Sequence, residues 1–134
     1  MSLKWKDEWS IGHEMVDSQH KELVDAVSNF INAYYAGKGA DVIGETMDFL
    51  LGYTVKHFID EEALQWSSNY PDYQNHKNLH EAFKVKAKEL SDKLKEEGPS
   101  KMLVMKINST ISEWLVNHIV REDKKIGEHL KAKK

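Results

Sequence analysis

Apolar residues recur every three or four positions through four long segments of this chain. This spacing places them on one face of an α-helix and is unlike the strict alternation of a β-strand. Glycine, asparagine and proline interrupt the pattern at three places, around residues 37–39, 69–72 and 98–100. The sequence therefore predicts an all-α fold with a short helical C-terminal tail and four main helices, at about residues 17–37, 40–66, 71–97 and 100–121.

The connections between these segments are short, so neighbouring helices should run antiparallel in an up-down-up-down four-helix bundle. A length of 134 residues suits a single domain, residues 1–134. Residues 1–16 form an N-terminal arm whose Trp5 and Trp9 should pack against the bundle. Asp17 and Ser100 each precede an apolar-periodic run and are the expected N-caps of the first and fourth helices.

The composition of the chain limits which metal ligands and which binding partners are possible. The chain has no cysteine, which excludes disulfides and thiolate-bound metals and leaves nitrogen and oxygen as metal ligands. A net charge of −3 without a basic cluster gives no reason to expect nucleic-acid binding. No apolar run has the length of a membrane span or a signal peptide. We therefore expect a cytoplasmic, monomeric protein that binds neither nucleic acid nor membranes.

The histidines occupy unexpected positions. Five of them, and one glutamate, fall on the apolar face that each helix should turn to the core: His20, His57, His76, His80, His118 and Glu61. Burying such groups is costly unless they are paired or bind a metal. One core histidine alone would be interpreted as a hydrogen-bonded structural residue. Six polar groups on four inner faces favour a metal site.

The spacing of these residues supports that interpretation. His57 and Glu61 are four residues apart, as are His76 and His80, so each pair shares one helix face. In an antiparallel bundle, the starts of the first and third helices lie at the same end as the ends of the second and fourth helices. All the candidate ligands should therefore converge there.

Four stretches resemble the hemerythrin family over nearly the whole chain: VDSQHKEL, HFIDEE, NYPDYQNHKNLHEAF and WLVNHIVRED. The resemblance implies a non-haem di-iron centre that binds dioxygen reversibly and is not an enzyme. It implies that His76, His80 and His118 bind one iron. His20 and His57 would then bind the other.

By the same resemblance, Glu61 and Asp123 bridge the irons together with an oxo or hydroxo group. The three-histidine iron is then six-coordinate, whereas the two-histidine iron keeps an open position for dioxygen. Spacing alone favours Glu122 over Asp123, because Glu122 lies four residues after His118. Asp123 lies about 140° round an ideal helix, so it requires a local distortion or a sideways reach. Glu122 remains the alternative ligand.

The resemblance also implies an oxygen pocket, lined by Leu23, Phe58, Trp114, Leu115 and Ile119. Ordinary core packing explains these residues equally well. Of the remaining histidines, His13 is expected in a loop, where a supporting role near the site stays open, and His129 is expected in a solvated tail.

Several alternatives stay open. A ferritin-like di-iron oxidase would need Glu-x-x-His pairs, and the chain has none. An oxygen or redox sensor usually carries an output domain, which this sequence does not show. An iron store, or a site for zinc or another divalent ion, is also compatible with these ligands. We expect a freestanding carrier, store or scavenger of dioxygen, with an oxygen-consuming enzyme as a possible recipient.

Overall fold

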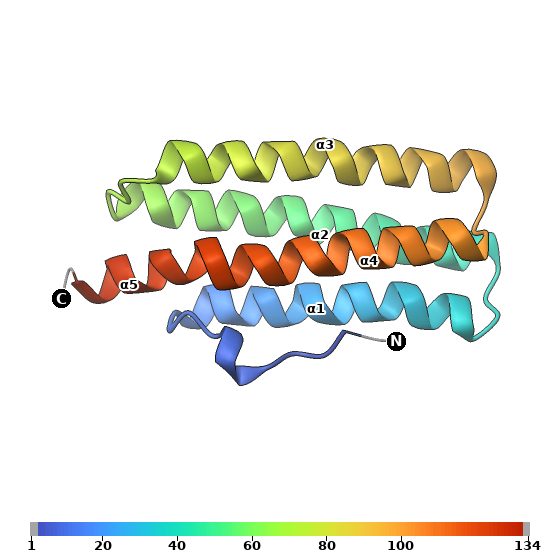
Figure 1. Ribbon diagram of the computed structural model, residues 1–134, viewed down its shortest axis with the longest axis horizontal. Helices are drawn as coiled ribbons and strands as arrows, with labels where there is room; N and C mark the ends of the chain where they lie inside the picture. Colours follow the sequence, from blue (N-terminus) through green and yellow to red (C-terminus); the bar gives the residue numbers. More distant parts are fainter. Residues whose placement is uncertain (1–2, 133–134) are drawn as a thin grey trace.

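The computed structural model describes residues 3–132 and is helical, with no strand in that range (Figure 1). Four long helices lie side by side: α1 (Glu14–Tyr35), α2 (Ala40–Ser67), α3 (Tyr73–Glu97) and α4 (Lys101–His118). Each runs antiparallel to the next along the chain (Figure 1). The predicted all-α four-helix bundle is confirmed.

The first helix begins three residues earlier than expected. Its N-cap is His13, whose ring Nδ1 accepts a hydrogen bond from the backbone N–H of Val16 at 3.3 Å. The prediction of Asp17 as the N-cap was therefore wrong. The Asp17 carboxylate instead accepts a hydrogen bond from the backbone N–H of Ile11 at 2.8 Å, because the N-terminal arm folds back over the first turn.

That arm packs on the bundle through its two tryptophans, as predicted. Trp9 lies in a short 3-10 helix, η1 (Asp7–Trp9), and is only 6% exposed. Trp5 meets it edge to face, with ring centroids 5.8 Å apart. The arm thereby covers an apolar face that α1 would otherwise present to water.

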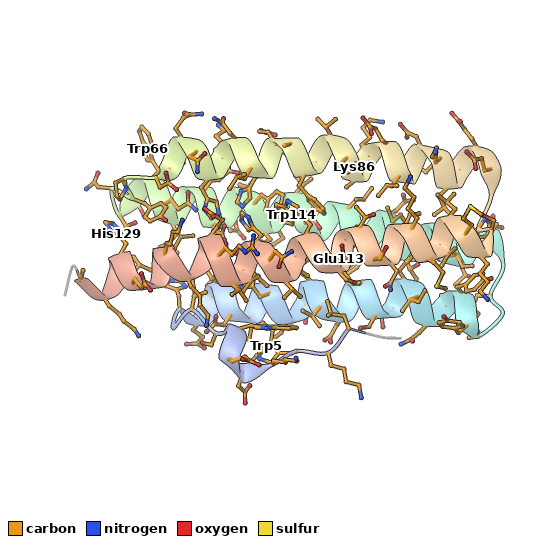
Figure 2. The ribbon with its side chains drawn as sticks, viewed as in Figure 1. Trp5, Trp66, Lys86, Glu113, Trp114 and His129 are labelled. Atoms are coloured by element: carbon orange, nitrogen blue, oxygen red, sulfur yellow. The ribbon has the colours of Figure 1, made fainter. Side chains whose placement is uncertain are left out.

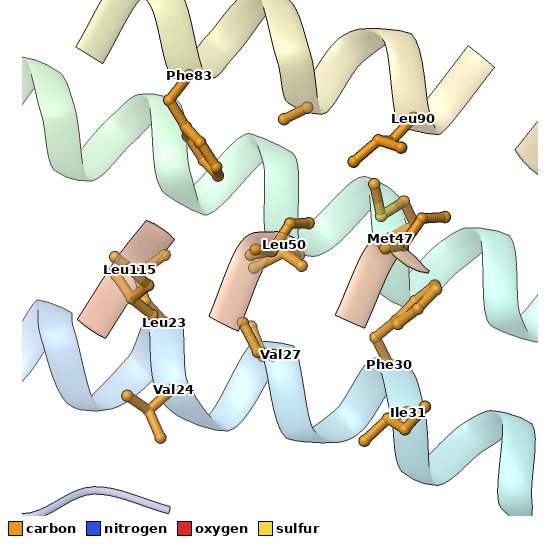
Figure 3. Close-up of a cluster of buried hydrophobic side chains, with 14 of the residues drawn as sticks. Leu23, Val24, Val27, Phe30, Ile31, Met47, Leu50, Phe83, Leu90 and Leu115 are labelled. Atoms are coloured by element: carbon orange, nitrogen blue, oxygen red, sulfur yellow. The ribbon is translucent and has the colours of Figure 1, made fainter. Parts of the chain in front are cut away.

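The core runs along the bundle axis and receives side chains from all four helices (Figure 3). Val27 and Phe30 of α1 point toward Leu50 and Met47 of α2 in this view, and Phe83 of α3 points into the same interior (Figure 3). These residues occupy the three- and four-residue spacing seen in the sequence. Burial of this common face holds the four helices together.

The fourth helix starts as predicted, with Ser100 Oγ accepting a hydrogen bond from the N–H of Leu103 at 3.2 Å. It does not end at a loop. A π-helical turn, η2 (Ile119–Asp123), joins it to α5 (Lys124–Ala132). In Figure 1, α5 continues the line of α4 past the end of α1.

Helix α5 is docked, not loose. A Cβ atom placed on Gly127 would lie 2.0 Å from the backbone oxygen of Ile11, so the helix touches the arm directly. His129, expected in a solvated tail, is half-buried, and its Nε2 lies 2.8 Å from the carbonyl oxygen of Ser68, to which it donates. That prediction was wrong because α5, which continues α4, passes close to the α2–α3 turn. Figure 2 shows His129 and Trp66 at this same end.

None of the helices within residues 3–132 combines the length and apolar character that crossing a membrane requires.

Candidate metal centre

Seven side chains gather near the end of the bundle that holds α5 and the α2–α3 turn. They come from α1, α2, α3, α4 and η2, and none is more than 6% exposed: His20, His57, Glu61, His76, His80, His118 and Asp123. Their donor atoms form two groups, each within 4.8 Å, that could hold a metal ion. The structure thus brings together every ligand expected from the sequence.

The first group contains three imidazoles. The Nε2 atom of His118 lies 3.1 Å from that of His80 and 3.0 Å from that of His76. One oxygen of each carboxylate completes the group. Glu61 Oε1 is 2.8 Å from His76 Nε2, and Asp123 Oδ1 is 3.1 Å from His118 Nε2.

The second group contains two imidazoles and the other oxygen of each carboxylate. His57 Nε2 lies 3.1 Å from Glu61 Oε2. His20 Nε2 lies 2.9 Å from Asp123 Oδ2 and 3.6 Å from Glu61 Oε2. Each carboxylate therefore turns one oxygen toward the three-histidine group and the other toward the two-histidine group.

The spacing of the donors tests whether these residues suit a metal. A six-coordinate ion with bonds of about 2.1 Å holds neighbouring donors about 3.0 Å apart, whereas a tetrahedral ion holds them about 3.4 Å apart. The contacts around His76 and His118 are 2.8–3.1 Å. The three-histidine group therefore fits a six-coordinate ion.

Unpaired polar atoms support the same fit. Within the described residues, both ring nitrogens of His20, Glu61 Oε2 and Asp123 Oδ1 are buried and make no contact with hydrogen-bond geometry, although His20 Nε2 lies 2.9 Å from Asp123 Oδ2 and 3.6 Å from Glu61 Oε2. Buried groups of this kind are rare, because each unpaired donor or acceptor costs about 1–3 kcal/mol. A cation in the two-histidine group would satisfy His20 Nε2 and Glu61 Oε2, and a second cation in the three-histidine group would satisfy Asp123 Oδ1.

Asp123, not Glu122, enters the cluster. The π-helical turn η2 adds a residue to the turn after His118, so that positions five apart come to lie on one face. This is the local distortion that the assignment of Asp123 required. Glu122 lies partly exposed and pairs with Lys125 Nζ at 3.5 Å.

The buried carboxylates and imidazoles shift one another's pKa values. Burial lowers the pKa of His20, but the Asp123 and Glu61 carboxylates raise it to about 9. Burial also lowers the pKa of His76, but the same two carboxylates raise it to about 10. Burial raises the pKa of Glu61, but the charge of His57 and contacts with neighbouring histidines bring it well below its ordinary value. Without a metal, protons on His20 and His76 therefore offset the charge of the two carboxylates.

Two of the imidazoles have outward hydrogen bonds that the sequence analysis missed. His80 Nδ1 lies 2.8 Å from Glu62 Oε2. His57 Nδ1 lies 2.7 Å from Gln19 Oε1. Glu62 and Gln19 each sit next to a candidate ligand in the sequence, at the edge of the inner face, and that adjacency was the available signal.

Aromatic rings enclose the cluster on the side toward the bundle centre. The Phe58 ring stacks on His80 with centroids 3.7 Å apart. Trp114 stacks on His118 at 4.3 Å and on Phe83 at 4.0 Å. Figure 2 shows Trp114 in the middle of the bundle, between the ribbons. These flat contacts fix the ring planes of His80 and His118.

Beside these rings lies a small apolar cavity of about 10 Å³, enough for about one water-sized molecule. Four of the five predicted pocket residues line it: Leu23, Phe58, Trp114 and Leu115. Figure 3 shows Leu23 and Leu115 meeting across α1 and α4. Ile119, the fifth, is fully buried but does not line this cavity.

Fold and cluster together define a four-helix-bundle protein with a buried, histidine-rich metal centre. The model of the Hemerythrin HHE cation binding domain matches residues 11–130, and the chain belongs to this family. The resemblance noted in the sequence is thereby confirmed.

Individual relatives agree with this placement. The bacteriohemerythrin of Stenotrophomonas maltophilia is 28% identical, over 97% of this chain and 82% of that protein. The bacteriohemerythrin of Methylococcus capsulatus is 31% identical, over 87% of this chain and 86% of that protein. A crystal structure of wild-type hemerythrin has a TM-score of 0.84 at 28% identity, covering 96% of this chain and 97% of that one.

Proposed function

We propose that this protein binds dioxygen reversibly at a pair of iron ions held by the seven clustered side chains. His76, His80 and His118 would hold one iron, and His20 and His57 the other. Glu61 and Asp123 would bridge the two. The observation that carries the proposal is the division of each carboxylate, one oxygen toward each histidine group.

The unequal histidine groups suggest where dioxygen binds. The three-histidine group offers five donors, and the two-histidine group offers four. With a shared oxo or hydroxo group, the iron held by His20 and His57 would therefore be the one with room for dioxygen. The iron pair would supply the electrons for holding dioxygen.

The chain's own task is to orient the ligands and exclude water. Phe58 and Trp114 clamp two imidazoles by stacking, and with Leu23 and Leu115 they line the apolar cavity beside the cluster. A cavity of this size and polarity suits a small apolar molecule and gives water few hydrogen-bond partners. The surroundings therefore favour binding and release over irreversible oxidation.

The donor set argues against an oxidase of the ferritin-like class. Such sites combine four or more carboxylates with Glu-x-x-His pairs, whereas this cluster has five imidazoles and two carboxylates. We favour a carrier or scavenger over an iron store or sensor for this chain, whose relatives are named bacteriohemerythrin and myohemerythrin. An oxygen-consuming enzyme would be the recipient, and the protein would act as a monomer.

One experiment tests the proposal. The protein is loaded with iron, reduced without air and then exposed to oxygen while the visible spectrum is recorded. We expect a new charge-transfer band that disappears when oxygen is removed and returns when it is readmitted. A single irreversible change to the ferric spectrum, or a preparation that holds zinc but no iron, would contradict it.

A further inference from the structure

A chain of hydrogen bonds runs from the surface of α2 to one candidate ligand of the two-histidine group. His57 Nδ1 lies 2.7 Å from Gln19 Oε1, and Gln19 Nε2 donates to Asp60 Oδ2 at 2.8 Å. Lys56 Nζ donates to the same carboxylate oxygen at 2.8 Å. Gln19 is almost buried, at 7% exposed, whereas the Asp60 side chain is 36% exposed.

Asp60, at the outer end of this series of hydrogen bonds, determines which group donates and which accepts in each of them. A carboxylate only accepts hydrogen bonds, so the Gln19 amide must turn its NH₂ group toward Asp60 and its oxygen toward His57. Facing an oxygen, His57 Nδ1 must carry a proton. In the neutral ring, Nε2 is then the nitrogen with the free lone pair, and this atom lies 3.1 Å from Glu61 Oε2 inside the cluster.

A reversed amide would have the opposite effect. If Gln19 turned its NH₂ group to His57, Nδ1 would have to accept and Nε2 would have to carry the proton. A protonated Nε2 cannot bind a metal. Asp60 is thus the group that excludes the unproductive tautomer, although two hydrogen bonds and the imidazole ring separate it from His57 Nε2.

The other histidine group is supported differently. His80 Nδ1 meets the carboxylate of Glu62 directly at 2.8 Å, with no amide between them. A direct carboxylate cannot be reversed, so His80 needs no outer group to fix its tautomer. Of His57 and His80, only His57 faces an amide that could turn either its oxygen or its NH₂ group toward the ring.

We infer that Asp60 is a positioning residue which, through Gln19, holds His57 in the tautomer able to bind the second metal ion. This inference rests on the proposed two-ion centre. It predicts that a partly exposed carboxylate governs the affinity of the two-histidine group and leaves the three-histidine group unchanged.

The test is anaerobic calorimetric titration of the full metal-free chain with ferrous ion. In Asp60→Asn the side-chain amide can accept or donate, so the direction is lost. We expect the second ion to bind about tenfold more weakly, at the lower end of the 10–100-fold loss seen for supporting residues at metal sites. The first ion should bind as in the wild type. Asp60→Glu, which keeps a carboxylate, should restore most of the affinity.

A matched control separates orientation from the loss of a surface ion pair. Lys88 and Asp92 form the same i,i+4 pair on α3, with Nζ and Oδ2 3.2 Å apart. Asp92 lies 12 residues beyond His80, about 18 Å along the helix. Asp92→Asn should match Asp60→Asn in the melting temperature of the metal-free protein and should bind both ions normally.

A double variant separates orientation from long-range charge. Gln19→Leu removes the link, so Asp60→Asn should cause no additional loss of affinity in the Gln19→Leu background. If Asp60→Asn lowered the affinity for the second ion equally in both backgrounds, Asp60 would act by charge alone. If Asp60→Asn bound both ions as Asp92→Asn does, Asp60 would have no role. Either result overturns the inference. A wild-type protein that binds fewer than two ions would instead refute the two-ion centre itself.

Discussion

Asp123 Oδ1 lies 3.1 Å from His118 Nε2 although the two residues are five positions apart in the chain. In a regular α-helix these positions would point about 140° apart. The π-helical turn η2 between them removes that offset and buries the Asp123 side chain to 1% exposure. One local change in helix geometry therefore determines which of two neighbouring carboxylates reaches the cluster.

This relationship predicts different outcomes for two adjacent substitutions. Asp123→Asn should lower metal affinity by more than about 100-fold, because a proposed ligand exceeds the 10–100-fold effect of supporting residues. Glu122→Gln should change it little, since Glu122 is paired with Lys125 outside the cluster. Metal content after dialysis, measured by elemental analysis, distinguishes them. Loss of metal in Glu122→Gln alone would show that the ligand is Glu122.

The same turn explains what the sequence could and could not predict. Periodicity alone placed His57 and His76 on inner helix faces, because buried positions repeat at helical spacing. It could not place Asp123, since a π-helical turn leaves no periodic signal. The position of His129 was missed for a similar reason: its hydrogen bond goes to a backbone carbonyl, that of Ser68, which any residue type provides.

Gln19 illustrates a different limit. A glutamine beside a predicted ligand could face solvent, the core or a neighbouring helix, and the sequence does not distinguish these. Its role depends on the meeting of α1 and α2, which brings it between His57 and Asp60. Contacts between helices of this kind follow from the rotation of each helix about its axis, which apolar spacing fixes only approximately.

The metal-free protein should lose stability in alkali. The pKa values of His20 and His76 are raised from 6.5 to about 9 and about 10 in the folded state. The folded chain therefore binds more protons than the unfolded chain between these values, and its stability falls as pH rises through this interval. The contribution is fully present below pH 6.5. Urea unfolding of the metal-free chain at pH 6.5, 8 and 9.5 measures the decline.

The iron-loaded protein provides the control for this prediction. Metal ions replace the protons on the imidazoles, so its stability should be much less sensitive to pH over the same interval. If the metal-free and iron-loaded proteins declined in parallel, the lost stability would come from groups outside the cluster.

The cavity beside Trp114 should control how long the oxygenated protein survives. Leu115→Ala enlarges the cavity and should cost about 2–5 kcal/mol in unfolding free energy. It should also admit water and speed irreversible oxidation. Leu90→Ala is the matched control: Leu90 is equally part of the core, 2% exposed, but lies ten residues beyond His80, about 15 Å along α3. It should lose similar stability and oxidise at the wild-type rate, as followed by the decay of the visible band.

Two glycines in helices should respond in opposite ways to alanine. In Gly127→Ala the new Cβ would meet the Ile11 carbonyl oxygen at 2.0 Å, so α5 and the arm must separate, at a cost of about 1–3 kcal/mol. In Gly52→Ala the new Cβ would meet no atom within 4 Å apart from the adjacent backbone of its own helix, and the better helix former should stabilise α2 by about 1 kcal/mol. Thermal unfolding followed by circular dichroism measures both changes.

Because α5 follows directly from the turn that holds Asp123, Gly127→Ala should also weaken metal binding, whereas Gly52→Ala should not. Destabilisation of equal size in both variants would show that the contact between α5 and the arm has no special importance.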